Sequence, residues 1–593
     1  MNLYPKSRKD LIEAALGKRP MDLLIKNVKM LNCFTGEVYP AEIGIYDGFI
    51  AHIETIFVEN DSLKESMEAK EVFDGKGNYL VPGFIDSHVH IESSMLNPVN
   101  FTKTVLPLGT TTVITDPHEV ANVVGLEGIR YMLEASEDLP MRQYILAPSC
   151  VPSVKGLEYS GAEFGEREIS EVLNWDRVIG LAEVMDFEGV IQSDERVMNI
   201  LQIAEKRNLF IQGHAPLLNG RRLSAYLCAG IESDHESYSG HEAMEKIRQG
   251  MYVDARESSF VQSIGSLVST FKMHENLPNL SFCTDDREPS DLINEGHINY
   301  VMQRAIDEGM NPIEVIISGT YRAAKEIGIK NLGAIAPGYV ADLILLPSQT
   351  DIKPISIFFN GKHVANNGKL LVDIPAKKLH FEETNTIKLS TPNVEFFKIK
   401  APIKDGFIST RVITYGSEGS PITKFNIETL PVKNNYLDIS QDTNLKYVAV
   451  INRHGRPNYT IGLVRNFGIS EGAVGSTVSH DSHNLTIVYS NPGEAVLVAK
   501  ELIKCGGGVI CVKNDRVLEK IELPIFGLMS KLPCDELSLK VETMNQALKG
   551  IGIHEMKPLL KIATLCLPVI PTARITDLGL VSVMEQKLVT LFL

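Results

Sequence analysis

The sequence lacks the features that mark secreted, membrane-spanning and nucleic-acid-binding proteins. Its eight cysteines are scattered and form no C-x-x-C pair, which excludes a zinc ribbon and favours reduced thiols over a disulfide framework. No apolar run approaches the roughly 18 uninterrupted residues of a membrane helix. Lys and Arg (58) are fewer than Asp and Glu (74), and the net charge of -16 argues against binding to nucleic acid or acidic membranes. Because the charged start MNLYPKSRKD also lacks the apolar segment of a secretory signal, we expect a cytoplasmic protein.

The distribution of strand-like segments predicts several domains in the 593 residues. Short strands and turn signals occur from Met21 to about Phe73 and again from about Gly338 to Leu371. About 260 residues lie between them, which is the usual size of a (β/α)8 barrel. We therefore predict one small β-sandwich domain built from both flanks (1–75 and 338–380), a barrel (76–337), a linker, and a C-terminal α+β domain (393–593).

Eight apolar runs with strand character occur in the middle region, and most are followed by an amphipathic helical pattern. They are VPGFID (81–86), TTTVIT (110–115), RQYILAP (142–148), RVIGLAE (177–183), NLFIQGH (208–214), GIESDH (230–235), GMYVDAR (250–256) and LSFCTD (280–285). Together with the flanking segments, these runs predict an α/β fold class: a (β/α)8 TIM-like barrel with a small β-sandwich domain and a C-terminal α+β domain.

Metal-ligating side chains end or follow five of these runs. His88 and His90 are two positions apart and should share one face of a strand end. Because the carboxyl ends of barrel strands form one rim, all the candidates should converge there: His88, His90, Glu183, His214, His235 and Asp285. Imidazole suits zinc, iron or manganese, and a carboxylate can bridge two ions. We predict a site for two divalent metal ions; the alternative is that each histidine is structural and satisfied by backbone groups.

Polar residues at two other strand ends and in the C-terminal region have more than one possible use. After the second run, Asp116, His118 and Glu119 could bind substrate, relay protons or hold another metal, although Asp before Pro also commonly caps a helix. Arg256 could bind a substrate acceptor or pair with a carboxylate. In the C-terminal region, SHDSHN places His480 and His483 on either side of Asp481. That motif suits a metal, a lid over the substrate, or a polar turn.

These motifs resemble a known family. GFIDSHVHIESS, with the later Glu, His, His and Asp, looks like the amidohydrolase superfamily of metal-dependent hydrolases. Within it, the chain is most similar to the bacterial and archaeal type of adenine deaminase, through GTTTVITDPHEVANVVG, GLAEVM, IQGHAP, SDHES, CTDDR and TVSHDSHN. The likeness covers nearly the whole chain. It departs at Ser258, where the family has Gly, and at Ser479, where it usually has Ala.

The resemblance implies hydrolytic deamination of adenine to hypoxanthine and ammonia in purine salvage, by a homodimer that uses Mn(II) or Fe(II), or Zn(II). It also implies that Glu183 bridges the ions, because no lysine stands at this strand end to be carboxylated. We expect the catalytic residues to be Asp285, which would move the water's proton, Glu183 and His235. The expected substrate-binding residues are Asp116, His118, Glu119 and Arg256. The alternatives are a different aminopurine deaminase, an N-acetyl-sugar deacetylase, or an inactive binding scaffold.

Overall fold

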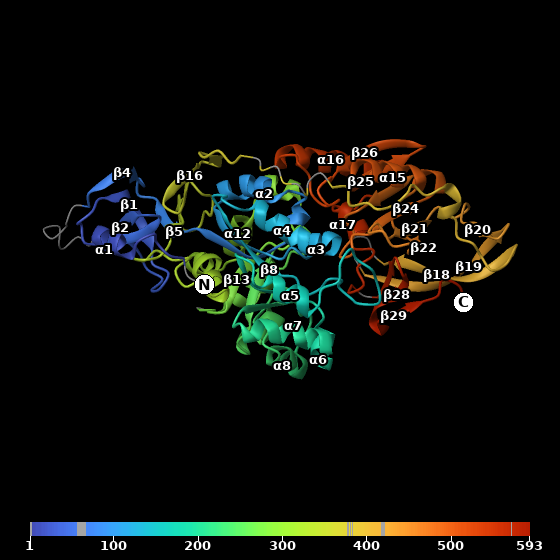
Figure 1. Ribbon diagram of the computed structural model, residues 1–593, viewed down its shortest axis with the longest axis horizontal. Coiled ribbons are helices and arrows are strands. Elements are labelled where there is room, and N and C mark those ends of the chain that lie inside the picture. The colour runs from blue at the N-terminus through green and yellow to red at the C-terminus, as the bar shows by residue number, and fades with distance from the viewer. Residues whose placement is uncertain are drawn as a thin grey trace.

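The computed structural model describes residues 3–55, 67–274, 276–375, 377, 379, 381, 384–416, 422–570 and 572–593. Figure 1 shows three regions in a row: a small β domain at one end, the barrel in the middle, and the C-terminal domain at the other end. Residues 56–66 of the predicted N-terminal strands, and 378, 380, 382 and 383 around the predicted linker, lie outside the described residues.

Nine of the described strands form one sheet from both flanks of the barrel, in the order β17-β16-β15-β14-β5-β1-β2-β3, with β4 beside β1. Strand β5 joins the two flanks, because it pairs in parallel with β1 and antiparallel with β14, where Leu80 lies opposite Leu345. The elements are α1 (Arg8–Ala15), β1 (Met21–Leu31), β2 (Val38–Tyr46), β3 (Phe49–Thr55), β4 (Ala69–Asp74), β5 (Tyr79–Pro82), β14 (Leu343–Leu346), β15 (Ser356–Phe359), β16 (Lys362–Asn366) and β17 (Lys369–Leu370).

Eight described strands form the barrel. They are β6 (Phe84–Val89), β7 (Thr110–Thr115), β8 (Arg142–Ala147), β9 (Val178–Val184), β10 (Phe210–Gly213), β11 (Ser233–Asp234), β12 (Tyr252–Arg256) and β13 (Leu280–Cys283). Strands β6 to β10 and β11 to β13 pair in parallel. The ring closes where Asp285 N donates to His88 O at 3.0 Å. Strand β11 is shorter than predicted because residues 230–232 form no ladder with β10. Glu232 N donates to Ile211 O at 2.9 Å, and Ile211 N donates to the Glu232 side chain at 3.2 Å.

Helices connect and cover these strands (Figure 1). Strands β7 and β9 are buried at every position, as expected for parallel strands covered on both faces. The barrel helices are α2 (Pro98–Val105), α3 (His118–Val124), α4 (Leu126–Ala135), α5 (Glu166–Val172), α6 (Phe187–Gln192), α7 (Glu195–Lys206), α8 (Gly220–Cys228), α9 (Gly240–Arg248), α10 (Ile264–Phe271), α11 (Pro289–Asn294), α12 (Ile298–Asp307), α13 (Pro312–Ile317) and α14 (Ala323–Glu326).

The C-terminal domain has a second nine-stranded sheet among its described strands, in the order β20-β19-β18-β22-β21-β24-β23-β25-β26, and a small sheet of β27, β28 and β29. The elements are β18 (Gly406–Tyr415), β19 (Thr423–Lys433), β20 (Tyr436–Leu437), β21 (Leu445–Ile451), β22 (Tyr459–Arg465), β23 (Ala473–Ser476), β24 (Leu485–Tyr489), α15 (Pro492–Cys505), β25 (Gly508–Lys513), β26 (Arg516–Glu522), α16 (Cys534–Gly550), α17 (Pro558–Ala563), β27 (Ala573–Thr576), β28 (Gly579–Ser582) and β29 (Lys587–Val589). The predicted fold class is confirmed; the residue limits of the four predicted segments stay predictions.

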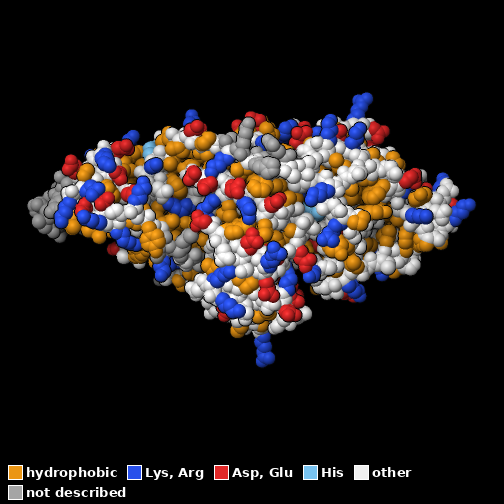
Figure 2. Space-filling view, in the orientation of Figure 1, with side chains coloured by type: hydrophobic (Ala, Val, Ile, Leu, Met, Phe, Trp, Pro, Cys, Tyr) orange, Lys and Arg blue, Asp and Glu red, His pale blue; other side chains and the backbone are white. Residues whose placement is uncertain are grey.

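The C-terminal domain docks beside the barrel rim. Ser530 N donates to Met95 O at 2.7 Å, and Lys557 Nζ lies 2.7 Å from Asp291 Oδ2 and 3.1 Å from Glu288 Oε2. Figure 2 shows basic and acidic side chains interspersed over one face of the molecule. In the described part of the chain, no helix is long and apolar enough to cross a membrane.

Candidate metal centre

The structure brings the six predicted ligands together at the carboxyl ends of the barrel strands. His88 is near the end of β6 and His90 follows it, Glu183 lies in β9, and the others follow β10, β11 and β13. His214 is half-buried and the remaining five side chains are buried. The His88 ring stacks on the His235 ring, with centroids 4.0 Å apart. Residues scattered over about 200 positions of sequence therefore share one small volume, as the barrel topology predicts.

His88 and His90 present two unprotonated nitrogens to each other. The Nδ1 atom of His88 lies 2.8 Å from Gln212 Oε1, and that of His90 lies 3.0 Å from the backbone oxygen of Asp116. Each Nδ1 must carry a proton in order to donate to these acceptors, so in the neutral ring, the form that binds a metal, the lone pair is on Nε2. The two Nε2 atoms are 3.1 Å apart, and they lie 3.5 Å and 3.3 Å from Asp285 Oδ1. These three electron-rich atoms repel one another unless positive charge lies among them, so this donor set fits a divalent metal ion.

Glu183 lies between two groups of histidines. Its Oε1 is 3.4 Å from His90 Nε2, whereas its Oε2 is 3.3 Å from His235 Nε2 and 2.6 Å from His214 Nδ1. Burial disfavours the carboxylate, but the neighbouring His214, with His235 and His90, outweighs burial and holds the pKa of Glu183 well below its usual range. One oxygen facing each group is the arrangement that a bridging carboxylate requires.

Arg256 pairs with carboxylates, which is one of its two predicted uses. Its Nη1 donates to Asp285 Oδ2 at 2.6 Å and also to Glu236. Burial opposes the charge, but Glu236 and Asp285 hold the pKa of Arg256 well above its usual range. The Nε and Nη2 atoms are buried and have no hydrogen-bond partner among the described residues. Arg256 therefore fixes one oxygen of Asp285 and still offers two donors.

Sequence reasoning missed Gln212 and Glu236. Gln212 lies two positions before His214, on the same face of the strand end, so the alternation that pairs His88 with His90 could have found it. Glu236 directly follows His235, and no spacing rule distinguishes it from an ordinary surface acid.

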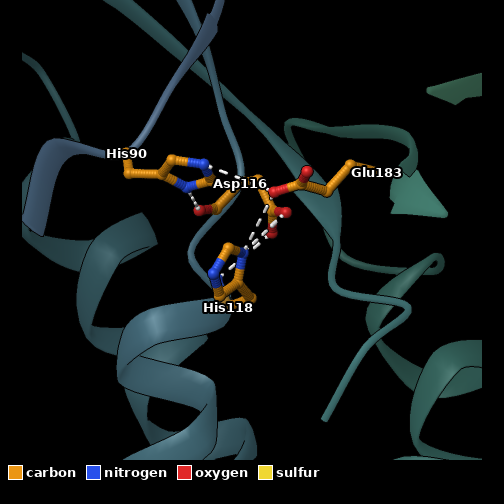
Figure 3. A group of neighbouring side chains, drawn as sticks. All are labelled: His90, Asp116, His118 and Glu183. Carbon is orange, nitrogen blue, oxygen red and sulfur yellow. Dashed lines mark hydrogen bonds and ion pairs between the residues drawn. The ribbon is translucent and has the colours of Figure 1, made fainter. Parts of the chain in front are cut away.

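Asp116 and His118 lie at the same rim, as Figure 3 shows beside His90 and Glu183. His118 Nδ1 is 3.0 Å from Asp116 Oδ2 and 3.5 Å from Glu183 Oε1. Asp116 Oδ1 also accepts the backbone N–H of His118, the first residue of α3, at 3.1 Å, although the N-cap residue of this helix is Pro117 and not Asp116. Burial opposes the imidazolium, but Asp116 and Glu119 hold the pKa of His118 well above its usual range.

Glu119 faces the C-terminal domain. Its Oε1 lies 2.7 Å from His480 Nδ1, and its Oε2 accepts from His483 Nε2. Burial lowers the pKa of His483 to about 4. Burial also acts on His480, but Glu119 outweighs it and raises the pKa of His480 to about 9. We call Glu119, His480 and His483 the interdomain clamp, because they join α3 to the loop that precedes β24.

The tautomer of His483 favours a clamp over a metal site at these three residues. The backbone N–H of Ser479 donates to His483 Nδ1 at 3.2 Å, so the ring proton is on Nε2. A protonated Nε2 can donate to Glu119 but cannot bind a metal.

Comparison with known proteins matches both large parts of the chain. Residues 79–371 match the amidohydrolase family, and residues 420–587 match the adenine deaminase C-terminal domain. Adenine deaminase 2 of Carboxydothermus hydrogenoformans is 39% identical over 584 residues, which cover 98% of each chain. Adenine deaminases of Kosmotoga olearia and Methanothrix thermoacetophila are 37% and 39% identical, over 98% of this chain and 99% of theirs. The chain therefore belongs to the adenine deaminase family of the amidohydrolase superfamily.

Proposed function

We propose that this protein hydrolyses adenine to hypoxanthine and ammonia in purine salvage. The supporting observation is that similarity to curated adenine deaminases extends over nearly the whole chain, including the C-terminal domain that the interdomain clamp holds at the barrel rim. A match confined to the barrel would favour hydrolysis in general and no particular substrate.

The ligand geometry supports a two-ion centre. We assign His88, His90 and Asp285 to one ion, His214 and His235 to the other, and Glu183 to both. Mn(II) or Fe(II) is the proposed metal, with Zn(II) as the alternative, because imidazole and carboxylate ligands suit all three. When bound, the two ions would lower the pKa of a shared water so that hydroxide is available at neutral pH.

Asp285 is the residue that we propose moves the proton. Arg256 holds its Oδ2, and its Oδ1 faces the two Nε2 atoms, so the carboxylate is fixed at the rim. The oxygen of water forms a bond to C6 of adenine, and the bond from C6 to the amino nitrogen breaks. Asp285 carries one water proton to the departing nitrogen, which leaves as ammonia, and the second water proton is transferred to N1 of the purine ring, which gives hypoxanthine.

Asp116, His118 and Arg256 are proposed to bind the substrate. Asp116 and His118 lie on the Glu183 side of the centre, and Arg256 lies on the Asp285 side with two free donors. We also expected Glu119 to bind substrate. We propose instead that it positions the loop that carries His480 and His483.

The test is ammonia release from adenine by Mn(II)-loaded protein, with metal-stripped protein beside it. Turnover by the loaded sample alone would support both the substrate and the metal requirement. A panel with guanine and an N-acetylated amino sugar separates the alternative hydrolases. Two bound ions per chain without turnover of adenine would refute the substrate assignment. The proposed homodimer is tested by light scattering.

A further inference from the structure

Asp481 is a buried residue, and one oxygen of its carboxylate accepts no hydrogen bond from the described residues. Its side chain is 4% exposed, and Oδ2 has no hydrogen-bond partner in the part of the chain that the structure describes. The ion-pairing nitrogens nearest to Oδ1 are His480 Nδ1 at 3.8 Å and His118 Nε2 at 4.0 Å, both beyond hydrogen-bond length. Buried polar atoms in native proteins nearly always have a partner, so this oxygen calls for a partner that the chain itself does not supply.

The loop that carries Asp481 is held on both sides. Glu119 binds His480 and His483, the residues flanking the Asp481–Ser482 pair. His454 Nε2 donates to Ser482 O at 2.8 Å, and the backbone N–H of His480 donates to Ala563 O at 2.8 Å. A residue that binds a ligand needs such support from its neighbours. Here these bonds fix the backbone on both sides of Asp481 and hold the base of its side chain in one place.

That place is beside the proposed active site. His118 lies between Asp481 and the metal centre, since its Nδ1 faces Glu183 while its Nε2 faces Asp481. An adenine whose C6 lies at Glu183 and Asp285 extends its five-membered ring away from the ions. That ring carries the only ring N–H of adenine, at N9 or N7, and an ionised carboxylate can only accept hydrogen bonds.

On the basis of the proposed function, we propose that Asp481 binds adenine by accepting a hydrogen bond from the N–H of its five-membered ring. The C-terminal domain thereby completes a substrate site whose metal ligands all come from the barrel. Glu119 is a positioning residue in this arrangement, because it holds the loop and does not touch the substrate. A methyl group on the same ring nitrogen removes the donor, so the wild-type enzyme should discriminate against 7-methyladenine and 9-methyladenine.

The experiment compares adenine, 7-methyladenine and 9-methyladenine in the Mn(II)-loaded full chain, for wild type and Asp481→Asn. A hydrogen bond to a charged acceptor predicts a KM for adenine about 10–100-fold higher in the variant, with a much smaller change in kcat. Wild type should prefer adenine over both methylated bases by about the same factor, because neither carries a ring N–H, and the variant should lose that preference. Asp577→Asn is the matched control, because Asp577 is equally buried at the domain junction but both its oxygens are bonded, to Tyr159 N and Asn452 Nδ2. It should keep the preference.

The outcomes separate this inference from the proposed function. Adenine turnover with unchanged KM and unchanged discrimination in Asp481→Asn would overturn the inference and leave the function in place. Equal wild-type turnover of adenine and either methylated base would overturn it without any variant, even if Asp481→Asn failed to fold. A third metal equivalent that Asp481→Asn loses would also overturn it, because Asp481 would then be a metal ligand. No turnover of adenine by wild type would refute both.

Discussion

Replacing Gln212 with Leu tests how the centre is built, because Gln212 fixes the His88 tautomer without itself being a proposed ligand. Its Oε1 accepts from His88 Nδ1 at 2.8 Å, and its Nε2 donates to Ser87 O at 3.1 Å, both in the interior. Without the acceptor, the His88 proton is free to move to Nε2, which removes the lone pair that a metal needs. Loss of such a partner typically weakens metal binding by about 10–100-fold, or roughly 1.4–2.7 kcal/mol.

The assay is Mn(II) affinity by competition with a chelator, alongside urea unfolding of the metal-free protein. Gln143→Leu is the matched control, since Gln143 is also buried on a barrel strand and donates to Pro98 O at 3.1 Å and Thr102 Oγ1 at 2.9 Å. Both variants should lose about 1–3 kcal/mol of stability for each buried group left unpaired. Only Gln212→Leu should bind Mn(II) more weakly, and wild-type affinity in that variant would refute the tautomer argument.

Three further variants test the proton carrier, a support of the site and the interdomain clamp. Asp285→Asn should lower kcat for adenine by about 10²–10⁴-fold, and unchanged turnover with both ions bound would contradict its role. Lys246→Met should lower the free energy of unfolding by about 3–5 kcal/mol, because it leaves two buried carboxylates without their cation. The Lys246 Nζ atom lies 2.8 Å from Asp234 Oδ2 and 3.0 Å from Glu242 Oε1. A loss below about 1 kcal/mol in urea unfolding would refute this ion pair. The pKa of His480 rises from 6.5 to about 9 on folding, so its stabilisation is complete below 6.5 and disappears as pH rises through 9. The difference in unfolding free energy between wild type and His480→Gln, at most ~3 kcal/mol, should shrink over that interval, and a constant difference would contradict the ion pair.

The barrel could be predicted from the sequence because its signals are local. Strand β7 runs from Thr110 to Thr115, as the apolar run TTTVIT predicts, and the ends of β8 and β9 fall within one residue of prediction. Barrel topology then brings strand ends to one rim whatever the loop lengths, so the meeting of His88 with Asp285 followed from chain order alone.

No sequence pattern of this kind predicts the contacts between domains. The partners Glu119 and His483 are 364 positions apart, and nothing in DPHE or SHDSHN indicates that the two motifs meet. The use of Arg256 was undecided for the same reason, because its carboxylate partners Glu236 and Asp285 follow two other strands. The gap at β11 also has no sequence signature, since one backbone and one side-chain hydrogen bond between Glu232 and Ile211 replace the ladder there.

The sheet that joins both flanks of the barrel also sets an order of events during synthesis. Strand β5 cannot gain its neighbour β14 until about 260 further residues have been made. At about 5–20 residues per second, the ribosome needs on the order of ten to fifty seconds for that stretch. Throughout that interval the emerging chain exposes an open edge along β5, where another polypeptide could pair. The small β domain is thus completed only after the whole barrel has been made, and β5 keeps this open edge until residue 346 has emerged.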